Sequence, residues 1–353
     1  MRLTRTPLVA AIAVAVVAAA FVASSALASK APIKPTTPAS HAATAHASQT
    51  PTAHTSQAGL EVGVADENPS VFESSYYKAL KLKISRYFLP YDIAASSKEK
   101  AQLYYFEVWI SRAETEGIQP LVAFYHNFAT PTKMPSVATY TKDVKAFLKL
   151  FPQVTLLQPW NEVNRGNVRE RSGNYDSPTP KQSAQYYLAL KKICPTCTIV
   201  GLDVLDSTTP AATIDYINAF KKDVGSKNMP KIWGLHNYSD TNHFYDQGTR
   251  DVLNDVPGQV WLTETGGLAK LSPSFRFSLS RQKKATSYMF DIADAHSKIT
   301  RLYVYQFYGA KNEKKASFDA GLMNYKGKPR PAYCVVYEHL LGKKKCPYKT
   351  VKN

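Results

Sequence analysis

The sequence predicts an α/β protein folded as a (β/α)8 TIM barrel. From Leu60 onward, strand-like and helix-like segments alternate, which is typical of a parallel sheet covered by helices. The alternation repeats eight times over roughly 290 residues, and a closed barrel usually needs about 250. An open doubly wound sheet is the alternative, but no Gly-rich phosphate-binding loop follows the first predicted strand.

Two segments precede the predicted barrel. Residues 1–28 resemble a signal peptide: Arg2 and Arg5 give a positive start, Leu8 to Val22 is apolar, and Ala26-Leu27-Ala28 is a small-residue cleavage pattern. The apolar run is short for a membrane span, so we expect secretion rather than a retained anchor, and no later segment is long and apolar enough to span. Residues 29–58, rich in Ala, Thr, Pro, Ser and His, are expected to form a disordered linker.

Residues 59–346 form the predicted catalytic domain. Its strands are expected at Leu60–Ala65, Leu82–Phe88, Gln119–Tyr125, Val154–Pro159, Thr198–Leu202, Ile232–His236, Gln259–Thr263 and Arg301–Gln306. Its clearest helices are expected at Lys98–Glu116, Val137–Phe151, Ser183–Ile193, Ala211–Val224, Ser278–His296 and Ala332–Leu341. Residues 347–353 form a basic tail.

The four cysteines are candidates for disulfides, because the chain is predicted to be exported. Cys334 lies near the start of the last predicted helix and Cys346 lies after its end, and the two are expected to close the C-terminal segment. Cys194 and Cys197 lie in a turn between a helix and a strand, where a small structural disulfide is a better interpretation than a redox dithiol. A zinc site made of all four is the remaining alternative, although one CxxC with two distant cysteines is a weak signal for it.

The charge and composition limit the possible partners. The formal net charge of +17 falls to about +15 once Arg2 and Arg5 are removed with the signal, which permits binding to anionic cell-wall or extracellular polysaccharide. The sequence has no nucleic-acid-binding motif, so we expect no nucleic-acid partner, and a solvated basic surface is the simpler interpretation. The chain has 22 Tyr, 15 Phe and 4 Trp, which suit stacking on flat ligands as well as core packing. We expect a monomer.

Polar residues gather where the predicted strands end, and in such a barrel the active site lies at the carboxyl ends of the strands. Two segments are the most informative. Gln-Pro-Trp-Asn-Glu ends the fourth strand and places Trp160, Asn161 and Glu162 at its tip, and Trp-Leu-Thr-Glu ends the seventh and places Glu264 there. A carboxylate at the end of a buried strand is costly unless it is paired or used, so two of them suggest the carboxyl pair of a glycosidase. The other strand ends contribute Asp66, Glu67, Arg86, His126, Asn127, Asp203, Asp206, His236, Tyr238, Tyr305 and Tyr308.

This pattern resembles the clan A retaining glycoside hydrolases, particularly the family 39 and family 5-like (β/α)8 barrels. The layout extends over roughly Leu60 to Leu341, and the match is sharpest at Trp160-Asn161-Glu162 and at Trp261-Leu262-Thr263-Glu264. The resemblance implies an enzyme that acts on β-linked glycosides by double displacement and needs no cofactor or metal. The alternating repeats, the export signal and the linker indicate that it is a bacterial secreted protein.

The resemblance also implies roles for single residues. Glu162 would be the acid/base and Glu264 the nucleophile, while Asn161 would bond the sugar 2-hydroxyl. Tyr238 would donate to Glu264, and Arg86 would lie beside that carboxylate. The remaining substrate-binding candidates are Trp160, His126, His236, Tyr305 and Tyr308. An acid must hold its proton, so Glu162 is expected in an apolar or anionic neighbourhood.

Several of these residues also have simpler structural interpretations. Arg86 could pair with Asp92 or another barrel acid, His236 could be a hydrogen-bonded core histidine, and Asp203 suits a hydrogen-bonding role. Many clan members have Trp at the end of the eighth strand, where this chain has Tyr305 and Tyr308. This departure leaves the sugar open.

Two other functions remain as alternatives. One is a non-catalytic carbohydrate- or cell-wall-binding protein on the same scaffold, because a fold does not determine a function. The other is a metal-dependent barrel hydrolase, which the absence of HxH and HExxH patterns argues against.

Overall fold

The computed structural model describes residues 59–165, 177–313, 315–342 and 344–352. The predicted signal peptide, the predicted linker and residues 166–176, which follow the fourth strand, lie outside these residues. Within them, nine parallel strands form one sheet in the order β5-β4-β3-β2-β1-β10-β8-β7-β6. The strands are β1 (Glu61–Ala65), β2 (Ile84–Pro90), β3 (Gln119–Tyr125), β4 (Leu156–Gln158), β5 (Thr198–Ile199), β6 (Asp203–Leu205), β7 (Ile232–His236), β8 (Gln259–Thr265) and β10 (Ile299–Tyr305).

The two ends of this sheet, β5 and β6, are halves of the same barrel strand. The backbone N–H of Val200 donates to Leu157 at 2.9 Å, and that of Gly201 donates to Ile232 at 2.9 Å. The segment between the halves therefore bonds β4 on one side and β7 on the other, and the sheet closes into a barrel of eight strands. A Cβ on Gly201 would collide with the ring of Pro230, which explains why glycine occupies the break.

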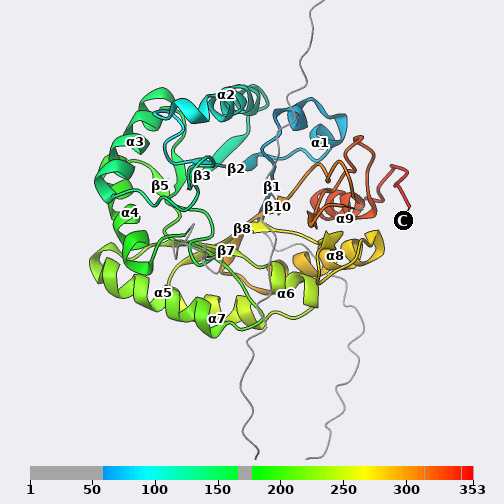
Figure 1. Cartoon of the computed structure of the whole chain (residues 1–353). Helices are drawn as coiled ribbons and strands as arrows, with labels where there is room; N and C mark the ends of the chain where they lie inside the picture. Colours follow the sequence, from blue (N-terminus) through cyan, green and yellow to red (C-terminus); the bar gives the residue numbers. More distant parts are fainter. Residues whose placement is uncertain (1–58, 166–176, 314, 343, 353) are drawn as a thin grey trace, which may run out of the picture.

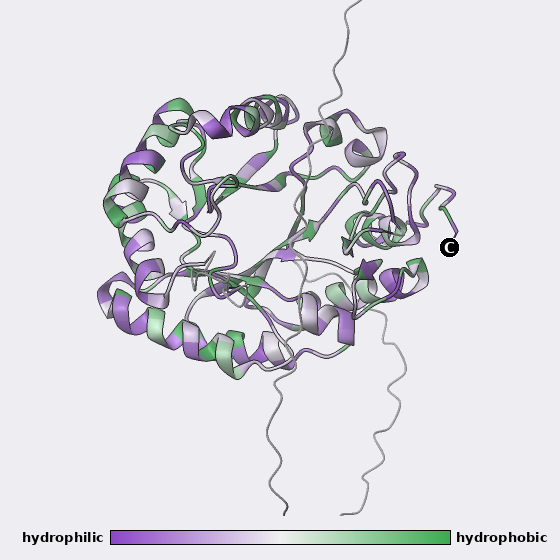
Figure 2. Cartoon of the chain, viewed as in Figure 1, coloured by the Kyte–Doolittle hydropathy of each residue, from purple (hydrophilic) through white to green (hydrophobic). Residues whose placement is uncertain are grey.

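The helices form a ring outside the strands (Figure 1). They are α1 (Ser75–Ala79), α2 (Lys100–Thr115), α3 (Val137–Leu150), α4 (Pro180–Ile193), α5 (Ala211–Val224), α6 (Tyr238–His243), α7 (Gln247–Asp255), α8 (Leu279–Ala295) and α9 (Pro331–Leu340), with short 3-10 turns at Pro69–Glu73, Ser97–Glu99 and Ser226–Asn228. Hydrophobic and hydrophilic residues alternate along these helices (Figure 2). This alternation gives each helix one face for the sheet and one for water.

Two hydrophobic clusters hold the layers together. The larger one fills the space between sheet and helices and includes Phe106, Trp109 and Phe147, all fully buried. The smaller one lies inside the barrel and includes Ile84, Leu121, Trp261 and Tyr303. Burying one such side chain contributes roughly 1.5–3 kcal/mol. The closed barrel and its helices confirm the predicted fold class.

The structure differs from the predicted elements mainly at their ends and in the loops. Helix α4 begins at Pro180, three residues earlier than expected, because Thr179 and Gln182 form a capping box and Pro180 suits the first turn. The sixth barrel strand is followed by α6 and α7, which were not predicted. A small antiparallel pair, β9 (Lys270–Leu271) and β11 (Phe318–Asp319), joins two loops.

The cysteines form two disulfides, Cys194–Cys197 and Cys334–Cys346. The second ties α9 to the segment that includes the predicted basic tail. That tail does not extend away from the barrel: the ring of Tyr348 packs against Tyr76, Tyr333 and Tyr337, and the Val351 N–H donates to Pro329. Among the described helices, none has the length and apolar character needed to cross a bilayer.

Candidate active site

The two predicted glutamates lie together at the carboxyl ends of the strands. Glu162 follows β4, and Glu264 lies near the end of β8, which is the seventh barrel strand. Their exposed fractions are 5% and 7%, and a carboxylate oxygen of each lies within 4.8 Å of the other. Glu162 has a backbone φ of 46°, a left-handed conformation that is rare for a residue with a side chain. Such a conformation costs about 1–3 kcal/mol and persists only where the surroundings enforce it.

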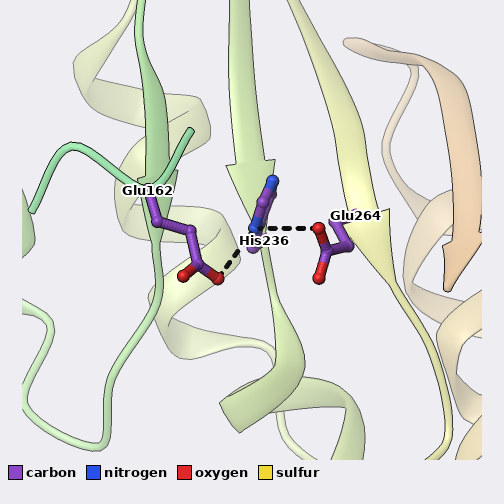
Figure 3. Close-up of side chains that lie close together, drawn as sticks. All are labelled: Glu162, His236 and Glu264. Atoms are coloured by element: carbon purple, nitrogen blue, oxygen red, sulfur yellow. Dashed lines mark hydrogen bonds and ion pairs between the residues drawn. The ribbon is translucent and has the colours of Figure 1, made fainter. Parts of the chain in front are cut away.

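His236, the last residue of β7, lies between the glutamates (Figure 3). Its Nδ1 is 3.1 Å from Oε1 of Glu162 and 3.8 Å from Oε2 of Glu264, and its Nε2 is 3.1 Å from Oδ2 of Asp203. Burial alone would lower the pKa of His236, but the charges of Asp203 and Glu264 raise it to about 10. The ring is therefore an imidazolium at neutral pH, held by three carboxylates.

Arg86, on β2, is fully buried inside the barrel and makes four polar contacts. It donates from Nη1 to Glu264 at 2.9 Å, from Nη2 to Asn161 at 2.6 Å and to Asp203 at 3.0 Å, and from Nε to Gln158 at 2.7 Å. The expected contact with Glu264 is present, whereas Asp92, the alternative partner, accepts instead from Asn127. Arg86 thus supplies positive charge directly beside the Glu264 carboxylate.

Asp203, on β6, is the carboxylate that pairs with both Arg86 and His236. It is fully buried, pairs with Arg86 and His236, and accepts from the Thr263 hydroxyl. Burial would raise the pKa of Asp203, but His236 and Arg86 lower it to about 2. Gly234 makes room for this carboxylate, because a Cβ there would collide with Oδ1 of Asp203.

The surroundings of Glu162 differ from the expected apolar or anionic neighbourhood. Arg165 donates from Nη1 to Oε2 of Glu162 at 3.0 Å, and His236 contacts the other oxygen. Burial raises the pKa of Glu162, but Arg165 and His236 outweigh it and hold the pKa below its usual value. Glu162 is consequently ionised at neutral pH in the ligand-free protein.

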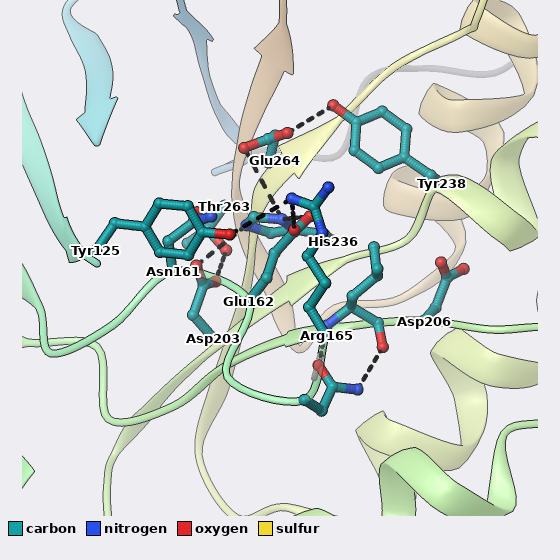
Figure 4. A network of polar contacts seen from close by, with 12 residues as sticks. Tyr125, Asn161, Glu162, Arg165, Asp203, Asp206, His236, Tyr238, Thr263 and Glu264 are labelled. Carbon is teal, nitrogen blue, oxygen red and sulfur yellow. Dashed lines mark hydrogen bonds and ion pairs between the residues drawn. The ribbon is translucent and has the colours of Figure 1, made fainter. Parts of the chain in front are cut away.

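Tyr238 and Asn161 complete the contacts around the pair (Figure 4). The Tyr238 hydroxyl donates to Oε1 of Glu264 at 3.0 Å. Asn161 accepts from Arg86 through its Oδ1, so its amide NH2 group is the end that can donate to a ligand. The Tyr238 contact is the one that the resemblance implied, whereas the contact of Asn161 with a sugar hydroxyl stays a prediction.

The remaining predicted residues lie in different places. Trp160 is fully buried and stacks between Tyr91 and Tyr186, so its place is the core; this corrects the expectation that it touches substrate. Tyr305 packs inside the barrel with Tyr238 in the smaller cluster, whereas Tyr308 packs in the outer cluster. His126 lies at the rim, in ring contact with Tyr125 and Phe128.

Several polar residues of the site had no assigned role in the sequence. Gln158 accepts from Arg86, Thr263 donates to Asp203, and Arg165 donates to Glu162. Each lies within a few residues of a predicted strand end, which is the signal that could have found them. Glu67, after β1, has a buried Oε1 with no hydrogen-bond partner. Burial, Asp66 and Glu264 raise the pKa of Glu67 well above its usual value.

Among the described residues, one group of side chains is close enough together to bind a metal ion. It consists of Glu162, His236 and Glu264. Arg86, Arg165 and the protonated His236 already neutralise the carboxylates. A further cation would meet this positive charge, so the arrangement suits proton transfer and covalent chemistry at a carboxylate.

No protein-family model matches this sequence, and no curated protein sequence matches it. Solved structures do resemble the fold. A family 39 glycoside hydrolase from the gut symbiont Bacteroides cellulosilyticus WH2 has a TM-score of 0.52 at 18% identity, over 81% of this chain and 64% of that one. Xylanase 10B from Thermotoga maritima has a TM-score of 0.58 at 14% identity, over 81% and 96%. The GH5_18 structure from Streptomyces cattleya, in complex with GlcNAc, has a TM-score of 0.58 at 14% identity, over 83% and 82%.

These identities are low, and the likeness therefore concerns the fold. The chain spans less than two thirds of the family 39 enzyme that it resembles. The fold of this chain is a (β/α)8 barrel, the architecture that these glycoside hydrolases share.

Proposed function

We propose that this protein is a secreted retaining glycoside hydrolase that cleaves β-linked glycosides. The observation that carries the proposal is the carboxylate pair, with oxygens of Glu162 and Glu264 within 4.8 Å at the mouth of the barrel. Retaining glycosidases have carboxyl groups about 5–5.5 Å apart, whereas inverting enzymes need about 6.5–9.5 Å to admit a water. The spacing favours retention.

Glu264 is the proposed nucleophile. Arg86 and Tyr238 each contact one of its oxygens, so its charge is supported while the carboxylate keeps a fixed orientation. In the first step, a Glu264 oxygen bonds to the anomeric carbon as the bond to the leaving oxygen breaks. The leaving oxygen keeps the bonding electrons and takes the proton of Glu162.

Glu162 then acts as the base of the second step. Glycosylation removes the charge of Glu264, and Glu162 takes a proton from water as the water oxygen bonds to the anomeric carbon and releases Glu264. Arg165 and His236 lower the pKa of Glu162, so the proton that this residue must donate in the first step is present mainly at acidic pH. The first step is therefore expected to be fastest on the acidic side of neutrality.

Secretion and the partner follow from other features. The signal-like N-terminus and the two disulfides support export from a bacterial cell. The proposed substrate is a carbohydrate, and the basic charge of the chain suits an anionic wall or extracellular polysaccharide.

The direct test uses Glu264→Ala and Glu162→Ala on a panel of aryl β-glycosides. Glu264→Ala is expected to lose at least about a thousandfold in kcat/KM on every substrate. Glu162→Ala is expected to lose far less on a dinitrophenyl glycoside, whose leaving group needs no proton, than on an alkyl glycoside. Glu73→Ala is the matched control, because its carboxylate pairs with Arg112 at the surface. Wild-type rates in both site variants, on a substrate that the parent cleaves, exclude the assignment.

A non-catalytic carbohydrate-binding protein is the second candidate. The observation that favours it is the Arg165 contact, which keeps Glu162 ionised and so opposes its role as an acid. Glycan binding without turnover at any pH between 4 and 8, across the same sugars, would select this function.

A further inference from the structure

Four aromatic side chains lie together at the barrel mouth, beside the glutamates. Phe88 lies near the end of β2, Tyr125 ends β3, and His126 and Phe128 follow in the next loop. Their ring centroids are 5.9 Å apart for Phe88 and Tyr125, 6.4 Å for Phe88 and Phe128, 5.8 Å for His126 and Phe128, and 3.9 Å for Tyr125 and His126. We call these four residues the aromatic strip.

The strip has one exposed end, which the fold holds in place. Phe128 is 37% exposed, a large fraction for a ring in contact with others. Its backbone N–H donates to the buried Glu99 carboxylate at 3.0 Å. The side chain of Asn127 accepts from Ala129 and Thr130 at 2.9 Å each and donates to Asp92 at 2.8 Å. Buried polar groups thus fix a loop that presents an apolar ring to water, which is the preorganisation expected of a binding surface.

The other end of the strip reaches the proposed acid/base. Nη1 of Arg165 lies 3.5 Å from the Tyr125 hydroxyl and 3.0 Å from Oε2 of Glu162. Figure 4 shows Tyr125 next to Asn161 and Glu162. Tyr125 itself is only 5% exposed, so a ligand that extends from the carboxylate pair toward the rim of β3 would meet the strip mainly at Phe128.

We propose that the aromatic strip is a sugar-binding subsite that stacks on a second ring of a glycan chain while the pair cleaves the neighbouring linkage. Phe128 meets Phe88 and His126 edge to face, at interplanar angles of 77° and 74°, so the flat surface that the strip offers is the face of the Phe128 ring. The apolar face of a pyranose ring matches such a surface, and a few polar groups beside it fix the orientation. The inference rests on the proposed function and deepens it: the substrate is an oligosaccharide or polysaccharide, and a glycoside of one sugar uses only part of the site.

The test compares Phe128→Ala with Phe128→Trp in the full chain. For each protein, kcat/KM is measured on an aryl β-monoglycoside and on a tetrasaccharide of the same sugar and linkage, and the ratio of the two is taken. Phe128→Ala is expected to lower the tetrasaccharide-to-monoglycoside ratio about tenfold, the usual effect of truncating an aromatic anchor. Phe128→Trp keeps a flat face and is expected to restore most of the ratio. Tyr104→Ala is the matched control, because that ring is 64% exposed on α2, in the outer ring of helices.

A binding arm separates failure of the subsite from failure of the proposed function. Titration calorimetry with β-1,4-linked hexasaccharides of xylose, glucose, mannose, N-acetylglucosamine and the anionic mannuronic acid is run on Glu264→Gln, with and without Phe128→Ala. Weaker binding in the double variant supports the strip even if the parent cleaves nothing, and in that case the hydrolase proposal falls. An unchanged ratio in an active parent overturns the strip and leaves the hydrolase. If no hexasaccharide binds and nothing is cleaved, both fall.

Discussion

Arg86 is the residue on which the charge balance of the site depends. It joins side chains from β4, β6 and β8, and it is one of three cations that face three carboxylates. A buried ion pair contributes little over an apolar pair of the same shape, but a buried charge left alone is costly. The arginine therefore matters for stability as well as for the reaction.

Arg86→Met is expected to lower the free energy of unfolding by about 3–5 kcal/mol, because it removes the buried cation that pairs with both Asp203 and Glu264. Urea denaturation followed by circular dichroism measures this change. Arg112→Met, which breaks only a surface pair with Glu73, is expected to change it by less than about 1 kcal/mol. Equal losses of unfolding free energy for the two substitutions would contradict the larger stabilising role given to the buried arginine.

Arg165→Gln is expected to move the alkaline limb of the pH–kcat/KM profile to higher pH. Arg165 lowers the pKa of Glu162, so its removal raises that pKa and keeps the acid protonated over a wider range. The profile of an aryl glycoside with a poor leaving group measures the limb. Arg250→Gln, in an exposed pair with Asp246, serves as the control. A limb that stays in place or moves to lower pH contradicts the role given to Arg165.

At the scale of single elements, the C-terminal helix depends on its disulfide. The bridge Cys334–Cys346 closes a segment with a sequence separation of 12, whereas Cys194–Cys197 closes one of only 3. The loss of chain entropy in the unfolded state grows with the length of the closed segment.

Replacing Cys334 and Cys346 with Ser is expected to cost about 3 kcal/mol of stability, and replacing Cys194 and Cys197 about 2 kcal/mol. Guanidinium denaturation of both double variants under oxidising conditions gives the comparison. A smaller loss for the C-terminal pair than for the turn would contradict the chain-entropy explanation.

The sequence was sufficient to predict most strands and the long helices, because buried parallel strands are apolar runs and the helices carry a regular apolar face. The division of the fifth strand was not predictable, since it depends on the packing of Gly201 against Pro230, which is distant in the chain. The short helices α6 and α7 were missed for a similar reason. The Asp206 carboxylate accepts from the backbone of Ser239 and Asp240 at the start of α6, across a separation of more than thirty residues.

The site was predictable in part. The positions of Glu162 and Glu264 followed from the count of strands, and the contact of Arg86 with Glu264 followed from the resemblance. The position of Trp160 could not be predicted, because only the packed structure shows that its ring stacks on Tyr186 of α4. The cationic surroundings of Glu162 depend on where the Arg165 side chain folds back, which no local pattern specifies.

At the scale of the whole molecule, stability is expected to fall as the solution becomes alkaline. The pKa of His236 is raised from 6.5 to about 10 in the folded state. Its contribution is complete below pH 6.5 and is lost as the pH rises through about 10. Asp206, whose pKa burial raises to about 8, acts in the same direction, because the folded state holds its proton more tightly than the unfolded state does.

The free energy of unfolding is therefore expected to drop by on the order of 4 kcal/mol between pH 6.5 and pH 10. Urea titrations at half-unit intervals of pH measure the slope. His236→Asn, which removes one titrating group, is expected to have a flatter curve over the same interval. Stability that rises across it would contradict the protonation state given to His236.

The pairing of β1 with β10 also has a consequence for the stage of folding at which the candidate site is completed. The first and last barrel strands are neighbours, and Arg86 meets Glu264 across a sequence separation of 178 residues. Contacts of such long range form late, because a large loop must close before they contribute. A chain that ends before β8 has the proposed acid/base but neither the proposed nucleophile nor the strand that completes the barrel, so the proposed activity is expected to arise in one step, at the end of folding.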